Sequence, residues 1–171
     1  NLYTLQAKAG KEYHIEILFK QRNERATLDF DLGKQVEINL NLAVEKVKDA
    51  DVVLFAGGIS PSLEGEEMPV EVPGFKGGDR TDIELPAVQR DLLKALKKAG
   101  KKVVFINYSG SAIGLVPESN TCEAILQAWY PGQAGGTAIV DVLFGDYNPA
   151  GRLPVTFLRM QVSCRILKIT P

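Results

Sequence analysis

The runs Asp51-Val-Val-Leu-Phe-Ala56 and Lys102-Val-Val-Phe-Ile-Asn107 decide the fold of this 171-residue chain. Both are short, apolar almost throughout and rich in β-branched or aromatic residues, the pattern of strands that are buried on both faces. Between them, residues 85–99 have the periodicity of an amphipathic helix, and Gly100 follows as a stop signal. Two buried strands joined through a helix indicate parallel pairing, because a parallel connection must cross over one face of the sheet.

Alternation of helix and strand continues on both sides of these runs. Residues 41–50 predict a helix capped by Asn41, residues 124–129 a third strand, and residues 135–144 a helix that stops at Gly145. We therefore predict an α/β fold, a mainly parallel sheet with helices on both faces in a three-layer sandwich, over residues 37–157. Basic side chains of the helix at 85–99 lie mostly outside its apolar stripe, and we interpret them as solvated surface: Arg90, Lys94, Lys97, Lys98 and the following Lys101.

The first 36 residues follow a different pattern. Residues 13–19 and 26–32 alternate between apolar and polar side chains, and the polar stretch 21–25 connects them, which predicts an antiparallel β-hairpin. Because two strands alone are marginally stable in water, we interpret residues 1–36 as the remnant of a larger β-sandwich or as a hairpin packed on the main domain. Residues 158–171 carry three basic residues and no acid, and we treat them as an atypical tail.

Composition and charge exclude several classes of protein. The 20 basic and 21 acidic side chains give a formal net charge of −1, so nothing favours a nucleic acid as partner. No uninterrupted apolar window approaches the roughly 18 residues that span a membrane. The two cysteines, Cys122 and Cys164, lack metal-site spacing. A Rossmann-like nucleotide-binding domain remains an alternative, but no glycine-rich phosphate loop follows a predicted strand, which counts against it.

The segment between Gly57 and Glu84 is the unusual part of the sequence. It far exceeds the roughly two to six residues of an ordinary βα connection, and it follows the carboxyl end of a predicted strand, where open α/β sheets bind ligands. Its acids have two interpretations: a solvated acidic loop, or a mobile flap that brings a carboxyl group to a sugar or a metal. The only histidine, His14, lies in the predicted hairpin, so no histidine supports a metal site here. The acids are Glu64, Glu66, Glu67, Glu71, Asp79, Asp82 and Glu84.

Four blocks of the sequence resemble one known family. They are Gly57-Gly-Ile-Ser-Pro-Ser-Leu-Glu-Gly-Glu-Glu-Met68, Gly77-Gly-Asp-Arg-Thr-Asp-Ile-Glu-Leu-Pro86 with Gln89, Ala128-Trp-Tyr-Pro-Gly-Gln-Ala-Gly-Gly136, and Val142-Leu-Phe-Gly-Asp-Tyr-Asn-Pro-Ala-Gly-Arg-Leu-Pro-Val-Thr-Phe157. In this order they resemble the C-terminal α/β sandwich domain of glycoside hydrolase family 3, over residues 51–157. The hairpin resembles the end of a protective-antigen-type β-sandwich, a carbohydrate-binding insert of some family members.

The resemblance implies a reaction, a substrate and a partner domain. Members are retaining exo-acting β-glycosidases, chiefly β-glucosidases and β-xylosidases, so the substrate is expected to be an oligosaccharide or β-glycoside, and neither a cofactor nor a metal is implied. A retaining mechanism needs two carboxyl groups about 5 to 5.5 Å apart. In this family the nucleophile is an aspartate on a preceding (β/α)8 barrel that this chain lacks, and the acid/base is a glutamate of the acidic loop. Glu66 is the first candidate and Glu64 the second.

The chain is then expected to be a fragment of a periplasmic or secreted enzyme, and inactive alone. Asp79 and Arg80 match an Asp-Arg pair expected to fix the loop and the following helix start, or to contact the sugar. Trp129 can stack on a sugar ring or, as the last residue of a strand, belong to the core. The alternative function is a non-catalytic carbohydrate-binding module, in which Trp129 and the acidic loop only hold the sugar.

Overall fold

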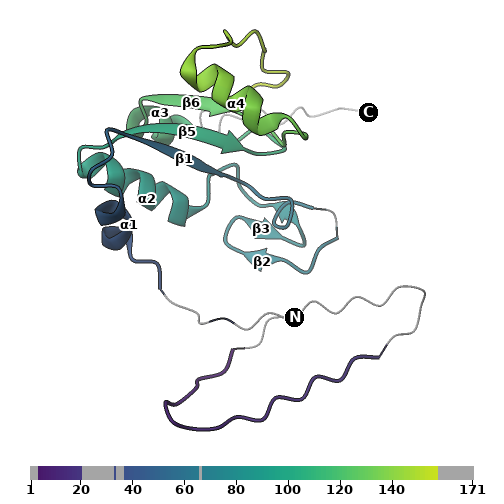
Figure 1. The fold of residues 1–171 in the computed structure, drawn as a ribbon. Coiled ribbons are helices and arrows are strands. Elements are labelled where there is room, and N and C mark those ends of the chain that lie inside the picture. Colours follow the sequence, from purple (N-terminus) through teal and green to yellow (C-terminus); the bar gives the residue numbers. More distant parts are fainter. Residues whose placement is uncertain (1–3, 21–32, 34–36, 66, 158–171) are drawn as a thin grey trace, which may run out of the picture. The chain divides into compact units, whose positions relative to one another are not determined.

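The computed structural model describes residues 4–20, 33, 37–65 and 67–157. Contacts between residues divide the chain into two units, Asn1–Glu37 and Ile38–Pro171. All the helices and strands of the described part of the chain belong to the second unit, whose elements are labelled in Figure 1.

In the first unit, the structure describes only one of the two runs of the predicted N-terminal hairpin. Residues 11–20 are neither helical nor paired as a strand, and the side chains of Ile15, Ile17 and Phe19 are about half exposed. The predicted partner run, residues 26–32, lies outside the described residues, as does the tail at 158–171. A run with apolar alternation needs a partner strand to form a sheet, so the hairpin stays a prediction.

The centre of the second unit is a parallel sheet with the strand order β1-β5-β6. β1 pairs with β5 along its whole length, and β5 pairs with β6, both in parallel. The two apolar runs that decide the fold are therefore neighbouring parallel strands, as predicted. The strands are β1 (Val52–Gly58), β5 (Lys102–Tyr108) and β6 (Ala124–Gln127), and the crossover helices are α2 (Ala87–Lys98) and α3 (Val116–Thr121).

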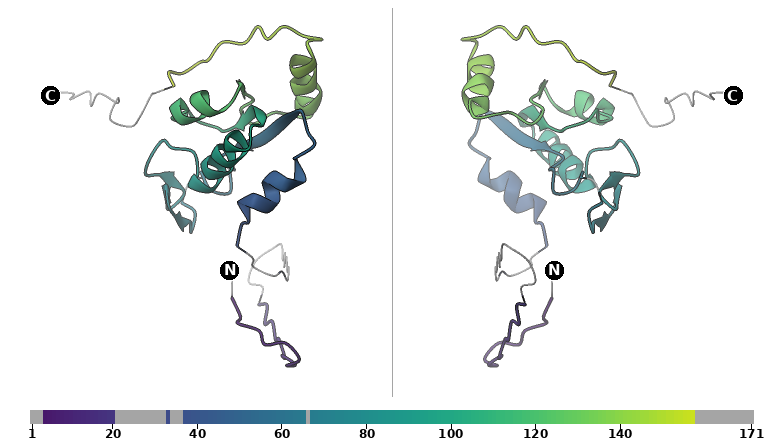
Figure 2. Two further views of the ribbon diagram at one scale, coloured as in Figure 1. Left: turned by 90° about the vertical axis from the view of Figure 1, so that its left-hand side faces the viewer. Right: turned by 90° about the vertical axis from the view of Figure 1, so that its right-hand side faces the viewer.

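Helices cover both faces of this sheet, which confirms the predicted three-layer α/β fold. α1 (Leu40–Lys46) and α2 lie on one side, and α4 (Gly135–Phe144) lies on the other, as the views in Figures 1 and 2 show. α4 has the predicted bounds and ends at Gly145, whose φ of 85° is the left-handed conformation that glycine adopts at helix ends.

The cap of α1 differs from the prediction. The side chain of Asn39, rather than Asn41, accepts a hydrogen bond of 3.0 Å from the backbone N–H of Leu42. The helix therefore begins at Leu40. Either asparagine has the chemistry of a cap, and the sequence pattern alone does not distinguish two asparagines that stand two positions apart.

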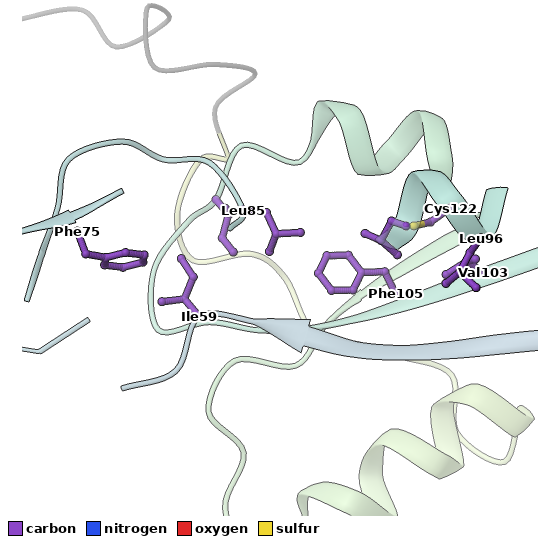
Figure 3. Packing of buried hydrophobic residues seen from close by; sticks show 9 residues of the cluster. Ile59, Phe75, Leu85, Leu96, Val103, Phe105 and Cys122 are labelled. Atoms are coloured by element: carbon purple, nitrogen blue, oxygen red, sulfur yellow. The ribbon is translucent and has the colours of Figure 1, made fainter. Parts of the chain in front are cut away.

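A buried apolar cluster connects the sheet, α2 and the long segment that follows β1. Phe105 of β5 is fully buried, and its ring centroid lies 5.6 Å from that of Phe55 on β1. Figure 3 shows the cluster running from Phe75 at one end, past Ile59 and Leu85, to Leu96 and Val103 at the other. Since Ile59 and Phe75 are both buried members, the segment after β1 is part of the core of the domain and not a detached loop.

That long segment also contains a small antiparallel sheet of order β2-β3-β4, which the sequence did not predict. Each strand has only two residues, too few for an alternating pattern to be visible. The turns between them require glycine, since Gly74, Gly77 and Gly78 all have φ between 64° and 90°. The strands are β2 (Glu71–Val72), β3 (Phe75–Lys76) and β4 (Asp79–Arg80).

Candidate active site

The carboxyl ends of β1, β5 and β6 meet at one edge of the sheet, and the segments that follow them are joined by hydrogen bonds. Ile59, just after β1, donates its N–H to the carbonyl of Tyr108 at the end of β5 (2.8 Å). The hydroxyl of Tyr130, after β6, donates to the carbonyl of Ile59 (2.7 Å). The three segments therefore lie together on one rim, as expected for parallel strands.

The exit from β1 is fixed by Gln89 of α2. The backbone N–H of Gly58 donates to Oε1 of Gln89 (2.8 Å), and Nε2 of Gln89 donates to the carbonyl of Gly58 (2.7 Å). Gly58 has a φ of 129°, and a Cβ atom at this position would collide with the backbone of Tyr108. Only glycine combines this dihedral angle with so close an approach, so the chain leaves β1 in one defined direction.

Glu64 lies on this rim in a polar cluster with Arg80 and Ser111. The hydroxyl of Ser111 donates to Oε1 of Glu64 (2.7 Å), and Nη1 of Arg80 donates to the same hydroxyl oxygen (2.8 Å). Nη1 also lies 3.9 Å from Oε1 of Glu64, which makes a second, longer ionic contact. Residues from three separate segments, the loop after β1, strand β4 and the loop after β5, therefore meet at one carboxylate.

The Arg80 guanidinium is held independently of Glu64. Its Nη1 donates to the carbonyl of Ala112 (2.8 Å), and its Nε donates to the carbonyl of Asp82 (3.1 Å). The cluster borders a cavity of about 300 Å³, large enough for a monosaccharide-sized group. The cavity is lined by Glu64, Arg80, Thr81, Asp82, Ile83, Ser111 and Ala112.

One oxygen of Glu64 and one nitrogen of Arg80 stay unpaired in this arrangement. Both Oε2 of Glu64 and Nη2 of Arg80 are buried and have no hydrogen-bond partner among the residues that the structure describes. Leaving a charged group's donor or acceptor buried and unpaired costs at least about 1 to 3 kcal/mol. Unpaired buried polar atoms in a native protein call for an explanation, and a catalytic or ligand-binding role is one of the recognised ones.

A second polar network supports the cluster from inside the sheet. Asn107 and Ser109 are fully buried at the end of β5, and Nδ2 of Asn107 donates to Oε1 of Gln127 on β6 (2.5 Å). The hydroxyl of Ser109 accepts from Nε2 of Gln127 (3.2 Å) and donates to the carbonyl of Ser111 (2.9 Å). The backbone of Ser111 is thus tied to two central strands. Sequence reasoning missed these residues, because buried polar side chains carry no periodic signal.

Of the four predicted site residues that the structure describes, it brings two together. Glu64 and Arg80 meet in the cluster, whereas Asp79, although next to Arg80 on β4, is exposed, and the described lining of the cavity includes neither Asp79 nor Trp129. Trp129 follows β6 rather than ending it, has a φ of 56°, and packs edge-on against Phe157 at 6.0 Å. Glu66 lies outside the described residues.

Arg90, predicted as solvated surface, instead joins a partly buried ionic network with Glu118 and Glu84. It donates through Nε to Glu118 (2.6 Å), through Nη1 to Glu84 (2.7 Å) and through Nη2 to the carbonyl of Gly114 (3.1 Å). Burial alone lowers the pKa of Arg90, but the hydrogen bonds that it donates to Glu118 and Glu84 outweigh this effect, and the net pKa is raised. Arg90 therefore stays charged and fastens the start of α2 to α3 and to the loop before it.

Two further observations bear on the class of protein. Over the described residues, no group of three or more His, Cys, Asp or Glu side chains is placed to hold a metal ion. Within the same part of the chain, no helix has both the length and the apolar character needed to cross a membrane.

Comparison with protein families gives one match over nearly the whole chain. The family model described as the glycosyl hydrolase family 3 C-terminal domain matches residues 2–166. Among curated proteins, the chain is 55% identical to a xylan 1,4-β-xylosidase of Xylanibacter ruminicola over 91% of its own length and 18% of the relative's. It is 44% identical to a periplasmic β-glucosidase of Salmonella typhimurium over 68% of this chain and 14% of that protein.

Solved structures show the same likeness. A β-glucosidase from Erythrobacter marinus matches with a TM-score of 0.63 and 39% identity, over 71% of this chain and 16% of that one. The β-glucosidase of Listeria innocua, solved with glucose among other ligands, matches with a TM-score of 0.62 and 27% identity over 74% of this chain. The chain spans less than a fifth of the length of each of these proteins.

Proposed function

Because the chain belongs to the glycosyl hydrolase family 3 C-terminal domain family, we propose that it is one domain of a retaining, exo-acting β-glycosidase. In this proposal the domain supplies the general acid/base carboxyl group, and an aspartate of a barrel domain elsewhere in the longer protein is the nucleophile. The two groups must stand about 5 to 5.5 Å apart on either side of the scissile bond. The acid/base comes from the segment after β1, with Glu66 as first candidate and Glu64 as second.

The observation that supports this role is the placement of the acidic segment. Ile59 and Glu64 are fixed by hydrogen bonds to the loops after β5 and β6, at the edge of the sheet where α/β folds bind ligands. A carboxyl group carried there can face a second domain that approaches the same edge. An acidic loop that was merely solvated would not need its first half tied to a buried network.

For the substrate, we propose a terminal β-linked xylose or glucose. The names of the relatives support this class, since one is a xylan 1,4-β-xylosidase and another a periplasmic β-glucosidase. The second name also supports a periplasmic or secreted location for the longer protein. We further propose that residues 1–36 derive from the end of a β-sandwich insert, which their separation from the second unit supports.

The stereochemistry of hydrolysis tests the proposed reaction. The longer protein, given an aryl β-xyloside or β-glucoside, is expected to release the β-anomer first, which proton NMR detects before mutarotation. Initial release of the α-anomer, or no hydrolysis of either glycoside, would refute the retaining assignment.

The 171-residue chain tests the division of labour between domains. Alone it is expected to hydrolyse neither glycoside, because proximity of two carboxyl groups on one substrate is required and it supplies only one. Turnover by the isolated chain that disappears in Glu66→Gln would show that the chain holds a complete site, and the two-domain proposal would be wrong.

A further inference from the structure

The hydroxyl of Ser111 bridges Glu64 and Arg80 by hydrogen bonds. Its one proton is donated to Oε1 of Glu64 (2.7 Å), so its oxygen is left to accept from Nη1 of Arg80 (2.8 Å). Because Arg80 is held by two backbone carbonyls, and Ser111 by the buried Ser109, neither neighbour needs Glu64 for its own position. Ser111 and Arg80 therefore fix the position of Glu64, and Glu64 is not needed to fix theirs.

The accessibility of the Glu64 oxygens bears on its chemistry. Oε1 is engaged by Ser111 and lies 3.9 Å from Arg80, and Oε2 is buried. A general acid must reach the glycosidic oxygen at hydrogen-bond distance, about 2.6 to 3.2 Å. In this arrangement Oε1 accepts a hydrogen bond from Ser111 instead of donating one, and Oε2 is covered, so neither oxygen of Glu64 is set to donate a proton to a substrate.

The backbone on the other side of position 66 is also fixed. Met68 donates its N–H to the carbonyl of Gly77 (2.9 Å), and Gly78 approaches the backbone of Gly65 so closely that a Cβ atom would collide with it. Glu67 has a φ of 50°, a left-handed conformation that costs a non-glycine residue roughly 1 to 2 kcal/mol. Anchors at Glu64 and Met68 thus stand two positions to either side of residue 66 in the sequence.

From these contacts, and resting on the function proposed above, we propose that Ser111 is a positioning residue for the acid/base loop and that Glu64 is its anchor, not the proton donor. The hydroxyl of Ser111, backed by Arg80, holds Glu64 and so fixes the first half of the loop. The proton is then carried by Glu66. Loss of the Ser111 hydroxyl releases the anchor and misplaces the acid/base, an error of the kind that costs rate without removing any reacting group.

The test uses the longer protein and two aryl β-glycosides that differ only in the leaving group. Phenolate is a poor leaving group that needs protonation, whereas 2,4-dinitrophenolate departs without it. A defect in acid catalysis therefore lowers kcat/KM for the phenyl substrate and spares kcat/KM for the dinitrophenyl substrate, because this ratio reports the step that breaks the glycosidic bond, whereas kcat also includes hydrolysis of the glycosyl-enzyme, in which the same group acts as base. Ser111→Ala is expected to lower kcat/KM for the phenyl glycoside roughly tenfold and to change the dinitrophenyl value less than about twofold. Ser111→Thr, which keeps the hydroxyl, should recover most of the loss.

Matched variants separate the possible explanations. Ser119→Ala removes an exposed serine that bonds only a helix carbonyl (2.8 Å) and is expected to leave both substrates unchanged. Glu66→Gln is expected to lose about 10²- to 10⁴-fold on the phenyl glycoside. Glu64→Gln, which is isosteric and keeps an acceptor for Ser111, is expected to lose no more than about tenfold there.

The outcomes of the inference and of the proposed function are distinguishable. If Glu64→Gln shows the large loss and Glu66→Gln the small one, the reaction stands but the anchor role of Glu64 is wrong. If Ser111→Ala slows both glycosides equally, or neither, its positioning role is wrong. If no glutamate variant shows a leaving-group-dependent loss, the proposed acid/base function itself fails. Should Ser111→Ala not fold, the Glu64→Gln and Glu66→Gln pair still decides between anchor and acid.

Discussion

Replacing Glu118 with alanine is expected to destabilise the domain strongly, although this residue is remote from the acidic loop. Its side chain is 1% exposed and accepts two hydrogen bonds from Arg90, at 2.6 Å from Nε and 3.2 Å from Nη2. In Glu118→Ala, the Arg90 guanidinium keeps Glu84 and the carbonyl of Gly114 but has donors without a partner, in a site where its own side chain is 16% exposed.

The magnitude follows from what remains around the arginine. Removing one partner from a buried ion pair costs about 3 to 5 kcal/mol, because the remaining charge is left uncompensated. Glu84 still neutralises part of the Arg90 charge at 2.7 Å, from a carboxylate that is 36% exposed, so we expect the lower end, about 3 kcal/mol. With an m-value of roughly 2 kcal/mol/M in urea, the unfolding midpoint falls by about 1.5 M.

Urea denaturation followed by circular dichroism measures this loss against an exposed control. Glu123→Ala removes the partner of Lys97 in a pair at 2.9 Å whose side chains are both about half exposed, and exposed pairs of this kind contribute about 1 kcal/mol or less. The double variant Arg90→Met with Glu118→Leu should lose less than Glu118→Ala alone, since no buried charge is left behind. Glu118→Ala within about 1 kcal/mol of Glu123→Ala would refute the argument that Arg90 depends on a buried partner.

Two further substitutions have expected outcomes that follow from local geometry. Gly58→Ala should lower the free energy of unfolding in urea by more than about 3 kcal/mol, because a Cβ atom at a φ of 129° meets the Tyr108 carbonyl. The control Gly136→Ala, in α4 with open space around it, should leave the free energy of unfolding unchanged or raise it by up to about 1 kcal/mol. Equal effects of the two substitutions would contradict the steric explanation. Burial raises the pKa of the Cys122 thiol from its usual 9.0 to about 11, so the unfolded chain releases this proton first as the pH rises. Its contribution to the free energy of unfolding is complete below pH 9 and is lost between about pH 9 and 11, a fall that a urea titration series should show and that Cys122→Ala should lack.

The parts of the fold that the sequence predicted are those with a local signal. β1 and β5 were found because their apolar runs are uninterrupted, and α4 because an apolar helix pattern ends at Gly145. α3 was missed because Val116–Thr121 is a single polar turn with a proline near its start. The strands β2 to β4 were missed because each has two residues, and their pairing depends on glycine turns and on the insertion of Phe75 into the core.

In the candidate site, too, the sequence predicted what has a local signal and missed the contacts between distant residues. The acidic segment was recognisable because its length and composition are unusual, but the partners of Glu64 were not. Ser111 stands 47 residues away in the sequence, and Arg90 was assigned to a solvated face although it bonds Glu118, 28 residues further on. Contacts of this range depend on the register of the parallel sheet, because β1 and β5 bring their carboxyl ends together only after they have paired.

The acidic loop must project from its domain and yet hold its catalytic group precisely, and these two requirements oppose each other. A group that acts on a substrate shared with another domain must project from its own domain, yet catalytic groups need to be held within about 0.5 Å of their working position. Ile59 and Phe75 anchor the segment in the apolar core, and hydrogen bonds fix the acidic stretch between them: Tyr130 donates to Ile59, Ser111 to Glu64 and Met68 to Gly77. Single bonds of this kind contribute about 1 kcal/mol each to folding, while the apolar cluster around Phe105 contributes far more. Cutting one of them should therefore impair the reaction long before it unfolds the domain, whereas loss of a core residue should do the reverse.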